Sequence, residues 1–200
     1  MHKTSDYGWS QRPPRSASYL NSIVVELAKQ TGATTVLDAG CGNGFLAGEL
    51  HRAGFDVTGV DADENGLEIA RQREPGPKFM TGNFEAAPPG IFDLVCSTEV
   101  VEHLYSPHDL ARYCFDALRP GGKLIISTPY HGYIKNVAIA VTNKWDHHHM
   151  PNLHGGHIKF WSRAELSRLL EQAGFVMKGF TGAGRVPYLW KSMILIAQRP

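Results

Sequence analysis

The segment Val36–Gly44, with the sequence VLDAGCGNG, joins a short apolar run to a turn in which glycine recurs at alternate positions. Its first residues have the character of a buried strand, and Asp38 marks the polar end of that strand. The glycines permit positive φ angles and a close approach of the backbone to a ligand; they are Gly40, Gly42 and Gly44. A helical pattern of apolar residues follows from Phe45. The segment therefore predicts a strand, a ligand-binding turn and a helix.

Two residues near this turn narrow the choice of ligand. A dinucleotide-binding loop needs a small residue where Phe45 stands, so an NAD-dependent oxidoreductase is disfavoured. Asp61 ends the next apolar run, Val57–Val60, and follows Gly40 by about 20 residues. At that position a carboxylate accepts hydrogen bonds from ribose hydroxyls. The loop and Asp61 together predict a site for an adenosine-type ligand.

The composition limits the class of protein. A length of 200 residues predicts a single domain over 1–200, with an N-terminal arm and helix in 1–33. The formal net charge of +1 shows no overall electrostatic bias toward nucleic acid or an anionic membrane, and it leaves a local basic patch open. We expect a cytoplasmic location and no membrane segment, because no apolar run approaches ~18 residues. The cysteines show no paired spacing, so we expect thiols at Cys41, Cys96 and Cys114.

Strand-like and helix-like segments alternate after the glycine turn. We expect strands at 35–38, 56–60, 78–80, 92–96 and 123–127, and helices at 44–53, 65–72 and 107–118. A closing pair of strands, 175–180 and 192–198, follows a helix over 162–173 with Ser162 as its N-cap. This order predicts an α/β fold: a Rossmann-like, doubly wound and mostly parallel sheet with a C-terminal antiparallel hairpin strand.

Two segments flank this pattern. A helix is expected over 16–30, and the arm before it carries Tyr7 and Trp9. The arm either closes over a ligand or covers apolar surface as a tail. Residues 131–157 are expected to hold a short apolar stretch and an irregular, histidine-rich run. The histidines of that run are His147, His148, His149, His154 and His157, and they provide either solvent-facing and substrate-binding groups or a second metal site.

Four segments in order carry a family resemblance. They are Val36–Gly44 (VLDAGCGNG), Val57–Asp61 (VTGVD), Phe92–Leu104 (FDLVCSTEVVEHL) and Leu118–Pro129 (LRPGGKLIISTP). This chain resembles class I S-adenosylmethionine-dependent methyltransferases over about residues 20–198. The resemblance implies S-adenosylmethionine as the methyl donor and an open sheet with one antiparallel strand.

The same resemblance implies a set of cofactor-binding residues. Asp38, Gly40, Cys41, Gly42 and Gly44 would form the loop against the homocysteine part, and Asp61 and Ala62 would hold the ribose and adenine. The family usually places an aspartate against the adenine amino group, whereas this chain has Asn83 and Phe84. Asn83 can still accept a hydrogen bond through its amide oxygen. Ser97 and Thr98 would line the pocket beside the methyl group.

Glu99, Glu102 and His103 stand at the end of the fourth expected strand, and their spacing predicts one shared helical face. Glu99 and His103 are the candidate catalytic groups that take a proton from an acceptor hydroxyl. The segment is also similar to ubiquinone-pathway O-methyltransferases and to small-RNA 3′-end 2′-O-methyltransferases. That similarity implies a divalent metal held by Glu99, Glu102, His103 and His157. The alternative is a hydrogen-bonding unit without a metal.

The segment 130–161 lies where the family builds its substrate lid, and it contributes the candidate acceptor-binding residues Tyr130, Trp145 and His149. Alternatively, its aromatic residues only pack the segment onto the sheet. The sequence thus predicts methylation of a hydroxyl oxygen on a small molecule. The rivals are an RNA 2′-O-methyltransferase, against which the near-zero charge counts, and a non-catalytic cofactor-binding member of the fold. The acceptor and the oligomeric state do not follow from these residues.

Overall fold

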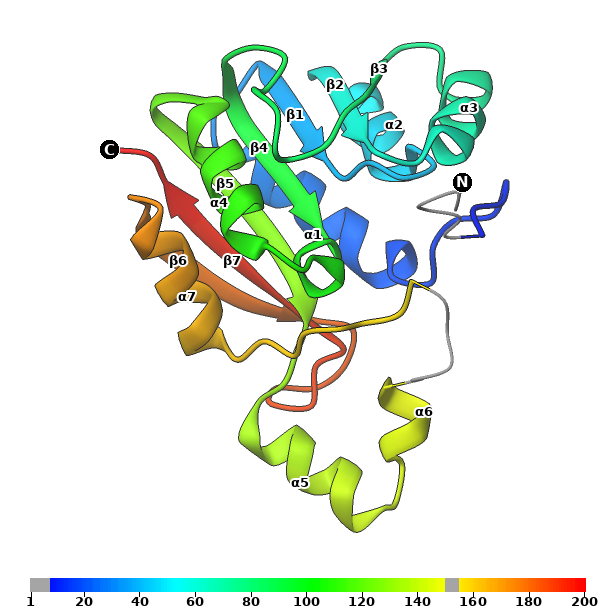
Figure 1. Ribbon diagram of the computed structural model, residues 1–200, viewed down its shortest axis with the longest axis vertical. Helices are drawn as coiled ribbons and strands as arrows, with labels where there is room; N and C mark the ends of the chain where they lie inside the picture. Colours follow the sequence, from blue (N-terminus) through cyan, green and yellow to red (C-terminus); the bar gives the residue numbers. More distant parts are fainter. Residues whose placement is uncertain (1–7, 150–154) are drawn as a thin grey trace.

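The computed structural model describes residues 8–149 and 155–200, and its centre is one sheet with the strand order β3-β2-β1-β4-β5-β7-β6 (Figure 1). The strands are β1 (Thr35–Ala39), β2 (Asp56–Asp61), β3 (Lys78–Thr81), β4 (Phe92–Thr98), β5 (Leu118–Pro129), β6 (Val176–Ala183) and β7 (Ser192–Gln198). Strands β1 to β5 pair in parallel, whereas β7 runs antiparallel to both β5 and β6. The predicted Rossmann-like fold class and its antiparallel C-terminal strand are confirmed.

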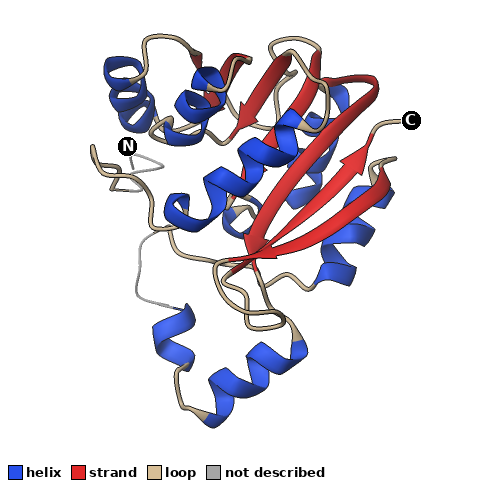
Figure 2. Ribbon diagram, turned by 180° about the vertical axis from the view of Figure 1, so that it is seen from behind, coloured by secondary structure: helices blue, strands red, loops and turns tan. Residues whose placement is uncertain are grey.

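Helices cover both faces of this sheet (Figures 1 and 2). The helices against the sheet are α1 (Ala17–Lys29), α2 (Phe45–Arg52), α3 (Glu64–Arg73), α4 (Pro107–Asp116) and α7 (Arg163–Gln172), whereas α5 (Tyr133–Val141) and α6 (Trp145–His149) extend beyond it. Helices α1 and α2 pack on one face, and α4 and α7 pack on the other. The expected helices differ from these bounds by one or two residues, and Ser162 caps α7 by accepting a hydrogen bond from the Glu165 amide at 3.2 Å.

Adjacent residues of the central strands belong to two different cores. Leu94 packs with α1 and α2, whereas Val95 packs with α4 and α7. Because successive side chains of a strand point to opposite faces, a strand covered on both sides has to be apolar throughout. The carboxyl ends of the parallel strands therefore share one uncovered edge, which is where open α/β sheets bind ligands.

The described part of the segment 131–157 contains one helix in the expected apolar stretch and a second in the histidine-rich run that was expected to be irregular. Helix α5 buries Lys135 and Ile139 on one side, whereas its other large apolar side chains are exposed: Tyr133, Ile134, Val137 and Val141. Helix α6 follows after a short turn, and both helices extend beyond the carboxyl end of β5 (Figure 1). Tyr7 and His154 lie outside the described residues. Among the described helices, none combines the length and apolar character that a bilayer span requires.

Candidate active site

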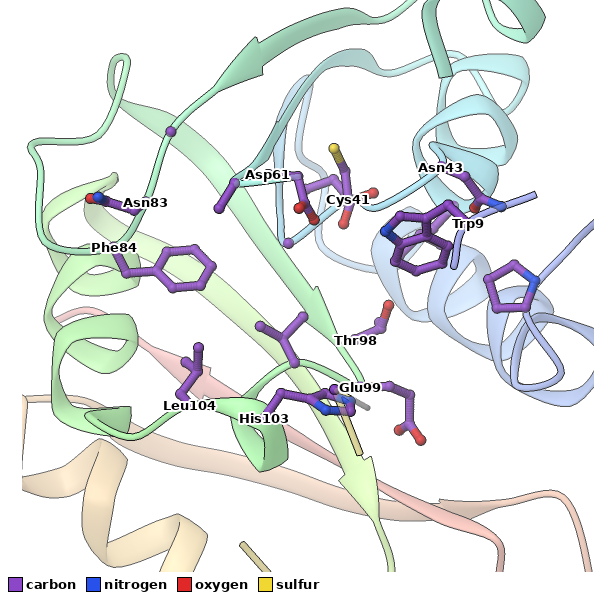
Figure 3. A pocket seen from close by; sticks show the side chains of 18 of the residues that line it. Trp9, Cys41, Asn43, Asp61, Asn83, Phe84, Thr98, Glu99, His103 and Leu104 are labelled. Carbon is purple, nitrogen blue, oxygen red and sulfur yellow. The ribbon is translucent and has the colours of Figure 1, made fainter. Parts of the chain in front are cut away.

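A cavity of about 770 Å³ opens at the carboxyl ends of β1, β2 and β4 (Figure 3). Seven of the predicted cofactor residues line it: Asp38, Gly40, Cys41, Asp61, Ala62, Asn83 and Phe84. The two candidate catalytic groups, Glu99 and His103, line the same cavity. The structure therefore brings the predicted donor site and the predicted acceptor groups into one continuous space.

The glycine turn owes its shape to backbone hydrogen bonds. The amides of Gly40 and Cys41 donate to the Val60 carbonyl at 2.8 and 3.1 Å, which ties the turn to β2. Gly40 has a φ of +85°, and a Cβ there would lie 2.4 Å from a Val100 methyl carbon. Gly42 and Gly44 also have positive φ angles, but neither lines the cavity. Their positive φ angles shape the turn, and their predicted contact with the cofactor stays a prediction.

Asp61 holds the turn through its carboxylate. One oxygen accepts from the Gly42 amide and the other from the Asp63 amide, both at 2.8 Å. Each carboxylate oxygen retains a second lone pair that a ribose hydroxyl can use. The role expected for Asp61 thus fits its position, and the same side chain also shapes the loop.

Asp38 is a buried carboxylate at the end of β1 with 1% exposure. Neither of its oxygens makes a hydrogen bond of normal geometry with the described part of the chain. Burial, followed by the charge of Asp61, raises the pKa of Asp38 to about 7. A cationic ligand group beside Asp38 would stabilise its charged form. The residues present therefore fit a cofactor with a cationic end.

Two of the expected cofactor contacts, those of Ser97 and Asn83, lie differently from the prediction. Ser97 is fully buried and donates to the Ala39 carbonyl at 2.9 Å, so it faces β1, whereas Thr98 lines the cavity as expected. The Asn83 oxygen accepts from the amides of Glu85 and Ala86, both at 3.1 Å, and is already engaged in its own loop. In Figure 3 the Phe84 ring points into the cavity and the Asn83 amide points away from that ring.

Glu99 has a left-handed backbone with a φ of +55°, which is uncommon for a residue with a side chain. The Ser127 carbonyl and hydroxyl hold its amide, both at 3.2 Å. The two carboxylate oxygens accept from the hydroxyls of Ser127 and Ser192 at 2.8 and 3.0 Å. Burial raises the pKa of Glu99 to about 7, and these hydroxyls together with the charge of Lys135 partly offset that rise.

This conformation overturns the expected shared helical face of Glu99, Glu102 and His103. The helical turn is a 3-10 helix that starts only at Val101, because the left-handed residue at 99 directs the chain out of β4 at a different angle. Glu99 therefore points toward β5 and β7. The spacing alone did not reveal this, since the conformation depends on contacts with Ser127, which is distant in the sequence.

Glu102, His103 and His157 form a compact cluster whose possible ligand atoms all lie within 4.8 Å of one another. The Glu102 side chain is 1% exposed; its Oε2 accepts from the Thr128 hydroxyl at 2.9 Å, and its Oε1 has no hydrogen-bond donor in the described part of the chain. Nδ1 of His103 lies 3.2 Å from the Gly156 carbonyl, and Nε2 lies 3.9 Å from Glu102 Oε1. Burial lowers the pKa of both histidines, so they are neutral near pH 7.

The expected acceptor-binding residues lie outside the lining of the cavity. Tyr130 packs against Trp190 with ring centroids 5.2 Å apart. The Trp145 and His149 rings pack with centroids 4.0 Å apart, and the His149 ring also stacks on His131 with centroids 5.6 Å apart. These contacts support the alternative in which the aromatic residues pack the segment 130–161, at least in the conformation seen here.

Lys135 is a residue near the site that the sequence analysis did not identify. It is 6% exposed, its ammonium donates to the Lys191 carbonyl at 3.2 Å, and its charge acts on Glu99. Burial lowers the pKa of Lys135 to about 8. Its spacing of four residues from the apolar Ile139 is the pattern that would have placed it on the buried face of a helix.

Comparisons with known proteins agree with this geometry. The family described as Methyltransferase domain matches residues 9–178. A curated ubiquinone biosynthesis O-methyltransferase from Thiobacillus denitrificans is 31% identical over 188 residues, which covers 90% of this chain and 81% of that protein. The crystal structure of magnesium protoporphyrin IX methyltransferase from Synechocystis PCC 6803 with bound SAH has a TM-score of 0.71 and 21% identity over 90% of this chain and 82% of that chain.

The fold alone does not fix a reaction. The crystal structure of the cyclase SpnF, an enzyme named for a different reaction, is equally similar to this chain in fold, with a TM-score of 0.71 and 18% identity over 90% of this chain and 80% of that chain. The family assignment rests instead on the family match over most of the chain and on the relative with 31% identity. By these findings the chain belongs to the class I S-adenosylmethionine-dependent methyltransferases.

Proposed function

We propose that this methyltransferase methylates a hydroxyl oxygen of a small molecule. The observation that carries the proposal is the position of Glu99 and His103, which line the far part of the cavity that begins at the cofactor loop. The Thiobacillus denitrificans relative is a ubiquinone biosynthesis O-methyltransferase, which supports oxygen as the acceptor atom. When bound, S-adenosylmethionine supplies an activated methyl group to the acceptor oxygen.

The residues of the chain contribute orientation and proton removal. His103 is neutral near pH 7 because burial lowers its pKa, so it can accept the hydroxyl proton. Ser127 and Ser192 fix the orientation of the Glu99 carboxylate, which lines the same cavity. The apolar side chains that line the cavity, such as Phe84 and Leu104, limit the access of water to the reacting atoms.

We further propose that the site binds a divalent metal ion. The residues that would hold it are Glu102, His103 and His157, whose carboxylate and imidazole donors suit such an ion and whose Glu102 Oε1 is buried without a donor in the described part of the chain. With Nδ1 at the Gly156 carbonyl, His103 would bind the ion through Nε2, the nitrogen that otherwise accepts the proton, so it would act as the base only without the ion. With the ion bound, the metal would act as a Lewis acid that acidifies the acceptor hydroxyl. Glu99, which the sequence resemblance added to this set, has both oxygens bound to serine hydroxyls and lies outside the cluster.

Tyr130, Trp145 and His149 are proposed to meet the acceptor only after α5, α6 and the turn before α5 move toward the cavity. The exposure of the Trp145 side chain, 56%, leaves it able to form such a contact.

We also propose that the protein acts in the cytoplasm, since the described cysteines are all buried thiols and suit a reducing compartment.

The donor site is tested by calorimetry and the acceptor site by turnover. We expect S-adenosylmethionine to bind the wild type, and Asp61→Ala to abolish measurable binding. In a panel of catechols, phenols, amines and short RNAs, we expect methylation of phenolic hydroxyls and a loss of about 100-fold or more in turnover for His103→Asn. Glu99→Gln should lose turnover while it keeps its affinity for the donor. Methylation of RNA alone, or donor binding without any turnover, would replace the proposal by one of its rivals.

The metal is tested by ion content as well as by activity. Purified wild type should retain about one divalent ion per chain after dialysis, and His157→Ala should lose it. Chelation should remove activity and add-back should restore it. Full activity in a chelated and metal-free sample would rule the metal out and leave His103 as the sole base.

A further inference from the structure

The N-terminal arm, Gly8–Ser16, lies against the cofactor loop and forms a wall of the same cavity (Figure 3). The Trp9 ring occupies the space that side chains at two glycines would need. A Cβ on Gly42 would lie 2.5 Å from Trp9 Cζ2, and a Cβ on Gly66 would lie 2.8 Å from Trp9 Cδ1. Gly42 does not line the cavity because this indole covers it.

Asn43 fastens the arm to the loop. Its side chain is nearly buried, at 2% exposure, and its amide nitrogen donates to the carbonyls of Ser10 and Arg12 at 2.9 and 3.1 Å. Asn43 is also part of the cofactor loop, one residue after Gly42. Docking of the arm and the shape of the loop are therefore coupled through one side chain.

Behind the arm, the cavity meets the start of α1. Ser16, Ala17 and Asn21 all line it. Asn21 is 5% exposed, and its amide nitrogen has no hydrogen-bond acceptor in the described part of the chain. A buried donor without an acceptor costs free energy unless a ligand supplies one. The N-terminus of a helix also favours a negative charge, and Ser16 makes no capping hydrogen bond there.

Whereas the start of α1 favours a negatively charged group, Asp38 favours a positively charged one, because it is a buried carboxylate in the same cavity. A donor at Asn21 and an acceptor at Asp38 match the carboxylate and ammonium groups of an amino acid. We propose that Asn21 and the start of α1 bind the carboxylate of the cofactor's amino acid part, and that Trp9, held by Asn43, closes over the loop beside it. This inference concerns the methyl donor, so it does not depend on the proposed acceptor.

Three probes separate the carboxylate from the rest of the cofactor: S-adenosylhomocysteine, its decarboxylated analogue, and methylthioadenosine, which lacks the whole amino acid. We expect Asn21→Ala to weaken S-adenosylhomocysteine about 10- to 100-fold, as for a hydrogen bond to a charged group. Affinity for the other two probes should stay within about twofold. Asn21→Asp, which preserves the size of the side chain, should weaken S-adenosylhomocysteine further through charge repulsion.

An equal loss for all three probes would make Asn21 a structural residue, and no loss would remove it from the site; either result overturns the proposal.

For the arm, we expect Trp9→Ala and Asn43→Ala to speed dissociation of S-adenosylhomocysteine about tenfold, with Trp9→Phe in between. Val176→Ala, an exposed truncation on β6 at the far end of the sheet, is the control and should leave the rate unchanged. Unchanged rates in both arm variants would refute the closing role.

Discussion

At the scale of single residues, Asp38 should make cofactor binding depend on pH. Burial raises its pKa to about 7, so its carboxyl is protonated in the empty site below neutral pH. A cationic cofactor group favours the ionised form, and binding therefore expels the proton. We expect the affinity for S-adenosylmethionine to rise with pH and to be about tenfold below its plateau at one pH unit under the pKa. Calorimetry between about pH 5.5 and 8.5 measures this dependence.

Asp38→Asn is the matched control, since it keeps the size of the side chain and removes the titration. This variant should bind more weakly at high pH and show a flat profile. The free energy of unfolding supplies an independent check. Because the native pKa lies above the ordinary value of 3.8, the native state holds the proton more tightly, and wild-type stability should fall as the pH rises from about 4 to about 7. A flat wild-type affinity profile would show that Asp38 does not face the cation.

At the scale of elements, the cap of α7 gives a prediction for stability. The Ser162 hydroxyl accepts from the Glu165 amide at 3.2 Å, which satisfies one of the unpaired donors in the first turn of the helix. Ser162→Ala should lower the free energy of unfolding by about 1 kcal/mol. Ser167→Ala, inside the same helix, replaces serine by a better helix former and should cost nothing. Chemical denaturation compares the two, and equal losses would mean that the cap contributes no stability.

The elements also show how far sequence patterns reach. The strands could be predicted because both of their faces are covered, so that runs such as that of β4 are apolar throughout. The cofactor loop could be predicted because its glycines act through local backbone angles. Three features could not be predicted from the sequence, because each depends on a partner far away in it. They are the left-handed backbone of Glu99, the position of the Trp9 indole over Gly42 and the burial of Lys135.

At the scale of the whole molecule, one edge of the sheet carries the three carboxylates that the donor and acceptor sites use. Strand β1 brings Asp38, β2 brings Asp61 and β4 brings Glu99 to this edge. Parallel pairing sets this arrangement, because it aligns the carboxyl ends of neighbouring strands. The antiparallel β7 adds Ser192 at its start, so the one reversed strand delivers a hydroxyl to Glu99 at the same edge. The topology therefore joins the donor and acceptor groups.

Because the cofactor site is built from the ends of several strands of one sheet, we expect cofactor binding to stabilise the whole fold. A ligand that binds only the native state at about 100 times its dissociation constant adds about 2.7 kcal/mol. For a chain of this size we expect S-adenosylhomocysteine to raise Tm by about 5 to 10 °C. Asp61→Asn keeps the size of the side chain but loses an acceptor for the loop amide and the ribose, so its Tm should respond far less. Differential scanning calorimetry of both proteins, each with and without ligand, decides the matter: an equal rise in the two would place the ligand away from Asp61.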